Sequence, residues 1–151
     1  MIEYKNGNLL DVKEGVIIHG CNSKGVMGSG VALGIKRKYP ECYNDYKHYC
    51  SNEPVALGLI SWYKHNDFLW IANAITQETY GRDSNKRYIN YAAICSAFRQ
   101  AVSFCISQGV SLNFPMIGAG LGGGDWVIIS MLIQDCDPKN KVKKICWIHN
   151  D

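Results

Sequence analysis

The sequence predicts an α/β domain of three layers, in which a mixed central sheet lies between helices. Three observations predict this class. Strand-like and helix-like segments follow one another along the chain, a continuously apolar run at 16–18 indicates a strand covered on both faces, and two glycine-rich segments each follow a strand and precede a helix. Because the chain has 151 residues, of which 47% are apolar, we expect residues 1–151 to form a single domain.

The first third of the chain is predicted to contribute two strands and two helices. Alternating residues at 2–5 predict a strand that ends at an Asn-Gly turn, and the apolar run at 16–19 predicts a second strand. A helix is expected over 29–39, where a proline follows it. Tyrosines spaced along one stripe predict a second helix over 41–50.

The rest of the chain is predicted to begin with a hairpin. The apolar runs 57–63 and 68–74 flank a polar turn, which is typical of paired antiparallel strands. Residues 75–88 are polar and contain a Gly-Arg-Asp turn, so we expect an ordered loop there. A long helix is expected over 90–108, ended by Gly109. The last three predicted elements are a strand at 110–114, a helix at 127–134 and a strand at 142–149.

Cysteine content and apolar patterning restrict the class of protein. Seven cysteines are an odd number in a chain of this size, and we expect them to be reduced thiols in a cytoplasmic protein. No C-x-x-C pair occurs, and His19 with Cys21 supplies too few ligands for zinc, so no metal or other cofactor is expected. No apolar run approaches the roughly 20 residues of a membrane-spanning helix, so no membrane partner is expected.

Charge patterning argues against a polyanion-binding protein. The formal net charge is +3, and the two basic clusters, at 36–38 and 139–144, are typical of solvated surface. A nucleic-acid-binding protein usually carries a denser basic stripe. We therefore do not expect nucleic acid as a direct partner. We also expect the protein to be a monomer.

The two glycine-rich segments predict an anion-binding site. The first, at 20–30, holds Asn22 among four glycines, and the second spans 115–126. Glycine lets a backbone approach a ligand closely, so that N–H groups converge on an anion at a helix N-terminus. Because both segments follow strands, we expect them to meet at one rim of the sheet. A ligand with two phosphates, or with a phosphate and a sugar, fits such a site.

Two common nucleotide motifs are excluded or weak. The Walker A pattern, which requires Gly-Lys followed by Ser or Thr, is absent. The glycines at 118–123 satisfy the dinucleotide fingerprint, but Lys143 stands about twenty residues further on, where an acidic residue binds the ribose. A nicotinamide-dependent dehydrogenase is therefore not expected.

Four motifs of this chain resemble the macrodomain family. They are Gly-Asn-Leu-Leu at 7–10, His-Gly-Cys-Asn at 19–22 with Gly-Val-Met-Gly-Ser-Gly at 25–30, Tyr-Pro at 39–40, and Ile-Gly-Ala-Gly-Leu-Gly-Gly-Gly-Asp-Trp at 117–126. The resemblance covers nearly the whole chain. It is greatest to the branch that contains yeast-type ADP-ribose 1″-phosphate phosphatase and the terminal ADP-ribose protein glycohydrolase. It implies a macrodomain fold and ADP-ribose, or a derivative of it, as the ligand.

The resemblance also implies which residues bind that ligand. The turn after the first strand is implied to hold the adenine, where Asn8 stands in place of the family's usual Asp and keeps one amide acceptor. The first glycine segment is implied to lie against the distal ribose and diphosphate, and the second to bind the phosphates with N–H groups. The implied ligand-binding residues are Gly7, Asn8, Leu9, Gly20, Cys21, Asn22, Met27, Gly28, Ser29, Gly30, Val31, Ile117, Gly118, Ala119, Gly120, Leu121, Gly122 and Gly123.

The glycohydrolase mechanism of the family is not expected here. In that branch a lysine follows an Ile-Thr pair and attacks the distal ribose, and an acid in the second glycine segment assists. This chain has Gln77 and Gly122 at these places. A glutamine side chain neither forms a Schiff base nor acts as a base at neutral pH.

The phosphatase branch matches the His-Gly-Cys-Asn segment, and it implies three catalytic candidates. His19 is expected to protonate the leaving oxygen, Asn22 to orient the ribose hydroxyls and Asp125 to position water. Two of them have a structural alternative that does not exclude the catalytic role: His19 as a core histidine and Asp125 as a helix N-cap. Three side chains of the loop before the long helix, Tyr80, Arg82 and Arg87, are second candidates for closing over the distal ribose or its phosphate, or else are incidental surface residues.

The function expected from the resemblance is hydrolysis of the 1″-phosphate of ADP-ribose 1″-phosphate. Two alternatives remain open. In the first alternative, the chain is a hydrolase that removes ADP-ribose from modified protein or nucleic acid. In the second, it is a non-catalytic binder that sequesters an ADP-ribose-type signal. Nucleic acid enters as a partner only as such a modified substrate.

Overall fold

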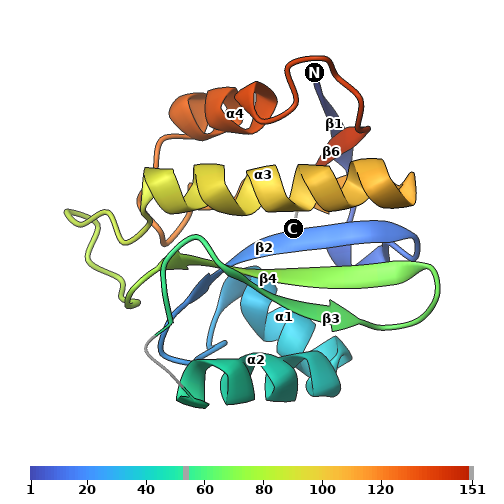
Figure 1. The fold of residues 1–151 in the computed structure, drawn as a ribbon. Helices are drawn as coiled ribbons and strands as arrows, with labels where there is room; N and C mark the ends of the chain where they lie inside the picture. The colour runs from blue at the N-terminus through green and yellow to red at the C-terminus, as the bar shows by residue number, and fades with distance from the viewer. Residues whose placement is uncertain (53–54, 150–151) are drawn as a thin grey trace.

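The computed structural model describes residues 1–52 and 55–149, and it shows a six-stranded sheet between two layers of helices (Figure 1). The predicted domain, 1–151, thus includes four residues outside the described part. The elements in chain order are β1 (Ile2–Asn6), a 3-10 turn η1 (Leu9–Asp11), β2 (Gly15–Asn22), α1 (Gly30–Lys38), α2 (Pro40–Asn52), β3 (Ile60–Lys64), β4 (Leu69–Gln77), α3 (Tyr91–Gln108), β5 (Leu112–Phe114), α4 (Trp126–Asp135) and β6 (Lys144–Ile148).

The sheet is mixed, as predicted. Its strand order is β1-β6-β5-β2-β4-β3, and only the pairing of β3 with β4 is antiparallel. The predicted hairpin is therefore confirmed. The other strands run parallel, so their carboxyl ends lie along one edge of the sheet, where the loops to the following helices begin.

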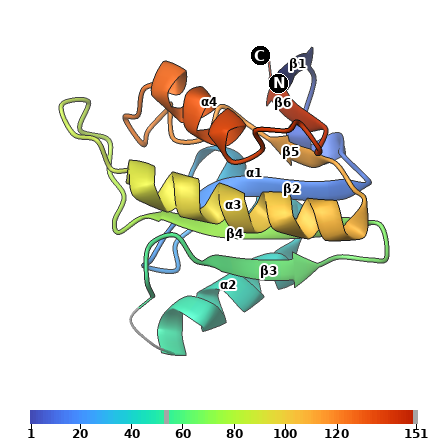
Figure 2. The same ribbon diagram turned by 45° about the horizontal axis from the view of Figure 1, so that its top comes forward.

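Helices cover both faces of the sheet, which confirms the three-layer α/β/α class. Figures 1 and 2 show α3 and α4 on one side of the sheet and α1 and α2 on the other. Successive side chains of β2 point to opposite faces of the sheet, because side chains alternate along a strand. Val16 and Ile18 pack with the α3 and α4 side, whereas Ile17 packs with the α1 and α2 side.

The strand β4 is longer than predicted. Residues 75–77 were expected in a loop, but they continue the strand because β2 extends to Asn22 and pairs Cys21 with Ile75 and Asn22 with Gln77. The strand β3 begins three residues later than predicted, at Ile60. The reason is Gly58, whose φ of 90° turns the chain while its N–H donates to the Ile75 carbonyl.

The ends of α3 follow the expected capping chemistry. The Asn90 side chain accepts a hydrogen bond from the Ala93 N–H, and Gly109 ends the helix with a φ of 68°. A positive φ of this kind is easily adopted by glycine, which has no Cβ. None of the helices among residues 1–52 and 55–149 combines the length and apolar composition that crossing a bilayer requires.

A buried ion pair lies near the start of β6. The Lys144 side chain is fully buried, and its Nζ donates to Asp137 Oδ2 at 2.5 Å, to Asn140 Oδ1 at 2.9 Å and to the Val142 carbonyl at 2.9 Å. Burial acts to raise the pKa of Asp137. The hydrogen bonds from Lys144, Val142 and Lys141 outweigh that effect and hold the pKa below its usual value.

All seven cysteines are free thiols in the structure. Burial raises the pKa of Cys42 to about 11, of Cys105 to about 12 and of Cys146 to about 11. These thiols behave as small apolar core residues, because only the thiolate form is a good nucleophile or metal ligand.

Candidate functional site

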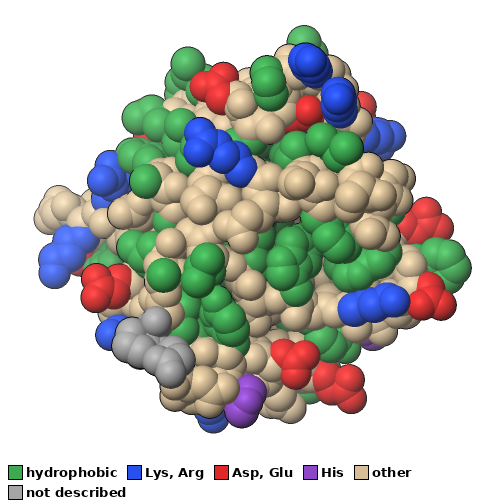
Figure 3. Space-filling model, in the orientation of Figure 1, with side chains coloured by type: hydrophobic (Ala, Val, Ile, Leu, Met, Phe, Trp, Pro, Cys, Tyr) green, Lys and Arg blue, Asp and Glu red, His purple; other side chains and the backbone are tan. Residues whose placement is uncertain are grey.

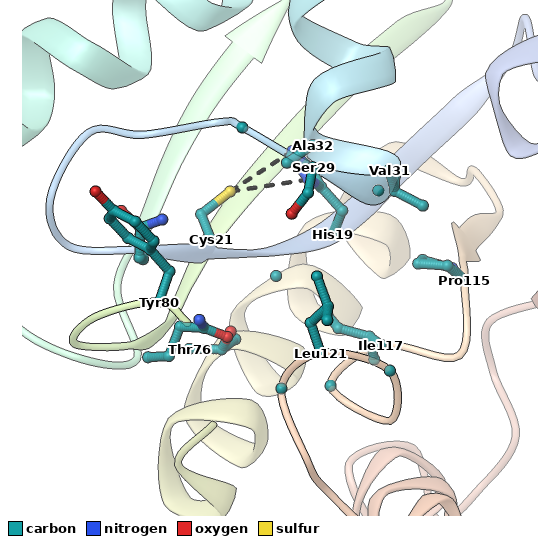
Figure 4. Close-up of a pocket in the computed structure, with 18 of the residues that line it drawn as sticks. His19, Cys21, Ser29, Val31, Ala32, Thr76, Tyr80, Pro115, Ile117 and Leu121 are labelled. Atoms are coloured by element: carbon teal, nitrogen blue, oxygen red, sulfur yellow. Dashed lines mark hydrogen bonds between the residues drawn. The ribbon is translucent and has the colours of Figure 1, made fainter. Parts of the chain in front are cut away.

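A cleft of about 480 Å³ lies at the carboxyl ends of β2 and β4 (Figure 4). One wall is the first glycine loop (residues 22–30) with the start of α1, and the other is the second glycine loop (residues 115–125). The two segments thus meet at one rim, as their positions in the sequence predict. The predicted site residues that line the cleft are His19, Gly20, Cys21, Asn22, Gly28, Ser29, Gly30, Val31, Ile117, Gly118, Gly120, Leu121 and Gly122.

Asn22 holds the first glycine loop in place. Its Oδ1 accepts hydrogen bonds from the backbone of Lys24 and Val26 and from the Tyr46 hydroxyl, and its Nδ2 donates to the Val26 carbonyl. The Tyr46 hydroxyl also donates to the Asn22 carbonyl at 2.6 Å. Most of the hydrogen-bonding capacity of this amide is therefore used within the protein, which leaves one N–H for a ligand hydroxyl.

The helix α1 begins at the cleft without a side-chain cap. Ser29 stands at the N-cap position but makes no capping hydrogen bond, and the first three residues of the helix, 30–32, line the cleft. By contrast, Asn90 caps α3 and Asp125 caps α4. The unpaired N–H groups and the positive end of the helix dipole make this N-terminus a site for an anion.

The second glycine loop presents further free N–H groups. Within the described residues, the N–H groups of Gly118, Gly120, Leu121 and Gly122 have no acceptor in the protein. The loop is held from behind, because the Gly122 carbonyl accepts from the backbone of Tyr88 at 2.7 Å and of Ile89 at 3.2 Å. Free backbone N–H groups in a glycine-rich loop are suited to bind phosphate oxygens.

No side chain fits at residue 122. A Cβ there would collide with Cγ2 of Ile89 and would lie 2.8 Å from the Gly118 carbonyl oxygen. The acid that the glycohydrolase branch carries at this place is thus excluded by packing as well as by sequence.

The cleft has one apolar end and one polar end, which Figure 4 shows on opposite sides. Val31, Ala32 and Pro115 lie at the apolar end, whereas Thr76 and Tyr80 lie at the polar end. A purine ring suits the first environment, and a sugar suits the second, because neutral hydroxyl and amide groups match sugar hydroxyls in hydrogen bonding.

The loop at 78–88 closes the polar end and carries basic side chains. Figure 3 shows Lys and Arg side chains at the left edge of the molecule, where this loop projects in Figure 1. Arg82 and Tyr80 line the cleft, whereas Arg87 lies over the Tyr91 ring at 4.4 Å and does not line it. Of the three candidates in this loop, the structure therefore brings two to the cleft.

His19 lies in the wall of the cleft but is nearly fully buried, and its role as a general acid stays a prediction. The side chain is 1% exposed, and its Nε2 lies 2.6 Å from Asn73 Oδ1. Burial lowers the pKa of His19 to about 4, although the hydrogen bond with Asn73 acts in the opposite direction. A pKa this low favours a neutral imidazole at physiological pH, which agrees with the core-histidine alternative.

The neutral His19 predicts a loss of stability in mild acid. Its pKa is about 6.5 unfolded and about 4 folded, so the unfolded chain binds the proton first as the pH falls. Between pH 6.5 and 4 this residue should cost about 3 kcal/mol of unfolding free energy. Urea unfolding across this range should show a shallower pH dependence for His19→Asn than for the wild type. The control is His48→Asn, which replaces an exposed histidine. A pH dependence in His19→Asn as steep as in the wild type would contradict the lowered pKa of His19.

Asp125 is a helix cap and does not line the cleft, and its expected role with water stays a prediction. Its Oδ1 accepts from the Val127 N–H at 2.8 Å, and its own N–H donates to the Tyr91 hydroxyl. The following Trp126 packs edge-on against Tyr4 and donates to the Tyr4 hydroxyl. Asp125 thus stabilises the start of α4.

Six implied ligand-binding residues do not line the cleft. Asn8 uses its side chain to cap η1 by accepting from the Leu10 N–H, and with Gly7 it lines a separate depression of about 450 Å³. Leu9 and Met27 are buried in the core beside α1 and α2. The other two, Ala119 and Gly123, do not line the cleft. Gly123 packs against the backbone of the 78–88 loop.

Two polar lining residues at the end of β4 were not among the predicted site residues, although Gln77 was matched to the position of the family's lysine. Thr76 and Gln77 line the cleft, but the segment that holds them was predicted as a loop. Their place at the carboxyl end of a parallel strand is the signal that points to a ligand site. Among the described residues, no group of His, Cys, Asp and Glu side chains is arranged to hold a metal ion.

The fold and the cleft together define an α/β protein with a site for a phosphorylated ligand. Residues 18–130 match the Macro domain family. The chain therefore belongs to the macrodomain family.

Known relatives carry two different activities. A DNA ADP-ribosyl glycohydrolase of Thermus aquaticus is 29% identical over 141 residues, which are 89% of this chain and 37% of that protein. The chain thus spans little more than a third of that relative. An ADP-ribose 1″-phosphate phosphatase of Candida albicans is 27% identical over 91% of this chain and 94% of its own length.

The fold is shared with a solved macrodomain. The macrodomain of Mycobacterium tuberculosis DarG superposes with a TM-score of 0.82 at 25% identity, covering 97% of each chain.

Proposed function

We propose that this chain binds ADP-ribose derivatives in the cleft and hydrolyses ADP-ribose 1″-phosphate to ADP-ribose and inorganic phosphate. One observation carries the proposal: the uncapped start of α1 and the residues of the second glycine loop whose N–H groups have no acceptor line the same cleft. A diphosphate between them would receive hydrogen bonds from both walls.

The two ends of the cleft orient the ligand. With the diphosphate between the glycine loops, the adenine lies at the apolar end against Val31 and Pro115. The distal ribose then lies at the polar end, near Thr76, Gln77 and Tyr80. Aromatic purine surface is removed from water at one end, while the sugar hydroxyls meet hydrogen-bonding groups at the other.

Arg82 favours a substrate with a phosphate on the distal ribose. It is the one Lys, Arg, Asp or Glu side chain among the described lining residues, and it lies two residues after Tyr80 in the loop at the polar end. A guanidinium binds phosphate with paired hydrogen bonds and offsets the charge that develops as the phosphate leaves. The phosphatase from Candida albicans, which this chain resembles over most of its length, supports the same reading.

A second candidate function is hydrolysis of ADP-ribose from modified DNA or protein. The similarity to a DNA ADP-ribosyl glycohydrolase favours it. Neither Gln77 nor Gly122 supplies the lysine or the acid of the family's glycohydrolase mechanism. This reaction would therefore depend on water attack assisted by the substrate itself.

Parallel incubations test the proposal. The protein is incubated with ADP-ribose 1″-phosphate, with ADP-ribosylated DNA and with an ADP-ribosylated protein, and the release of phosphate and of ADP-ribose is measured. We expect phosphate from the first substrate. ADP-ribose release from a modified macromolecule, without phosphate release, would favour the second candidate. ADP-ribose binding without any turnover would identify a binder.

The variant Arg82→Gln refines this test. We expect it to lower kcat/KM for ADP-ribose 1″-phosphate by about 10-fold or more, because a charge-assisted hydrogen bond to phosphate is lost. Arg87→Gln changes the same type of residue in the same loop, but Arg87 lies on Tyr91 outside the cleft and should leave the rate within about twofold. Equal rates for the two variants would contradict a role of Arg82 at the phosphate.

A further inference from the structure

Thr76 carries a buried hydroxyl without a partner. The residue is 1% exposed and lines the cleft, yet within the described residues its Oγ1 has no hydrogen-bond partner. A buried polar atom in this state costs free energy, and nearly all buried polar groups in native proteins are paired. Such an atom in the wall of a ligand cleft points to a contact that forms when the ligand binds.

The position of this hydroxyl is fixed by its surroundings. The Thr76 carbonyl accepts from the Asn90 N–H at 2.8 Å, and an antiparallel bridge joins the next residue, Gln77, to Ile89. Threonine is branched at Cβ, so its χ1 angle has little freedom on such a backbone.

Glycine at position 20 keeps the hydroxyl open to the cleft. A Cβ at Gly20 would lie 2.8 Å from Thr76 Oγ1 and 3.3 Å from Cγ1 of Ile117. Because Gly20 and Ile117 also line the cleft, any larger residue at position 20 would cover the oxygen.

The neighbouring amides already use part of their hydrogen-bonding capacity. The Asn22 Oδ1 accepts hydrogen bonds from the backbone of the first glycine loop, as described above. Gln77 donates from Nε2 to the Thr79 carbonyl at 2.7 Å. Thr76 therefore offers this end of the cleft a hydroxyl with both its donor and its acceptor capacity unused.

We propose that the Thr76 hydroxyl is a ligand-binding group that hydrogen-bonds the distal ribose of ADP-ribose. The inference rests on the proposed function, since it takes the diphosphate to lie between the glycine loops. A neutral hydroxyl that both donates and accepts matches a sugar hydroxyl, which has the same capacity. Thr76 thus distinguishes ADP-ribose from nucleotides that end at the diphosphate.

Calorimetric titration of Thr76→Val with ADP-ribose and with ADP tests this. Valine keeps the branched shape but lacks the hydroxyl, so ADP-ribose should bind about 10-fold more weakly while ADP, which lacks the distal ribose, should bind within about twofold of the wild type. The melting temperature should not fall, because the variant no longer buries an unpaired oxygen. Thr76→Ser, which keeps the hydroxyl, should retain ADP-ribose affinity within about threefold.

Each other outcome overturns the inference. Unchanged ADP-ribose affinity in Thr76→Val would remove Thr76 from the site. An equal loss for ADP-ribose and ADP would show a structural effect on the whole cleft. These failures appear in the variant alone, whereas a wild-type protein that does not bind ADP-ribose would overturn the proposed function and this inference together.

Discussion

Replacing Gly120 by valine is expected to weaken ADP-ribose binding by at least about 100-fold, roughly 2.8 kcal/mol. Gly120 lines the cleft and has no backbone angle that requires glycine. A Cβ at this position would meet no protein atom within 4 Å, so the fold accepts the side chain. The isopropyl group would instead occupy the space that the diphosphate needs beside the loop N–H groups. Isothermal titration calorimetry with ADP-ribose measures the effect.

The control for this variant is a valine far from the cleft. Ser107 is exposed near the end of α3, roughly 25 Å along the helix from the Asn90 cap that borders the site. Ser107→Val should leave affinity unchanged, and both variants should keep the melting temperature of the wild type within a few degrees. Wild-type affinity in Gly120→Val would show that the ligand does not lie against the second glycine loop.

Replacing Lys144 by methionine is expected to cost about 4 kcal/mol of unfolding free energy. Methionine fills similar space but leaves the Asp137 carboxylate buried with hydrogen bonds from Lys141 and Val142 alone. An uncompensated buried charge is the reason for the large effect. Urea unfolding measures the loss. Lys143→Met, at the neighbouring exposed lysine, should change stability by less than about 0.5 kcal/mol.

A double variant separates charge from packing at this pair. Asp137→Asn combined with Lys144→Met removes both charges and should recover at least about half of the loss. In the wild type, the pKa of Asp137 is lower folded than unfolded, so its stabilisation is present above the unfolded pKa of about 3.8 and is lost as the pH falls through the folded pKa. A Lys144→Met protein within 1 kcal/mol of the wild type would contradict this account.

Much of the fold could be predicted because hydrophobic periodicity and turn residues act locally. The order of the strands and long helices follows from such patterns, and both ends of α3 follow from Asn90 and Gly109. The extension of β4 to Gln77 was not predictable in this way. Residues 75–77 are drawn into the sheet by pairing with Cys21 and Asn22, more than 50 positions earlier in the chain.

The candidate site was predictable where it consists of backbone and not where it depends on side-chain environment. Glycine patterns indicated the two loops that form the cleft, because these patterns report backbone geometry directly. The state of His19 depends instead on Asn73, which lies opposite it on β4, and on the helices that bury it. Its pKa is set by those distant residues, so sequence alone left the acid and the core histidine equally open.

Burial disfavours the thiolate form of most cysteines of this chain. The pKa is raised for six of the seven thiols, at positions 21, 42, 50, 105, 136 and 146. Since alkylating agents and peroxide react with the ionised sulfur, we expect these six thiols to react slowly with both at neutral pH in the folded protein. We expect a thiol label to react with these six cysteines mainly when the core opens. The mass of the labelled protein over time then measures how often the native structure unfolds.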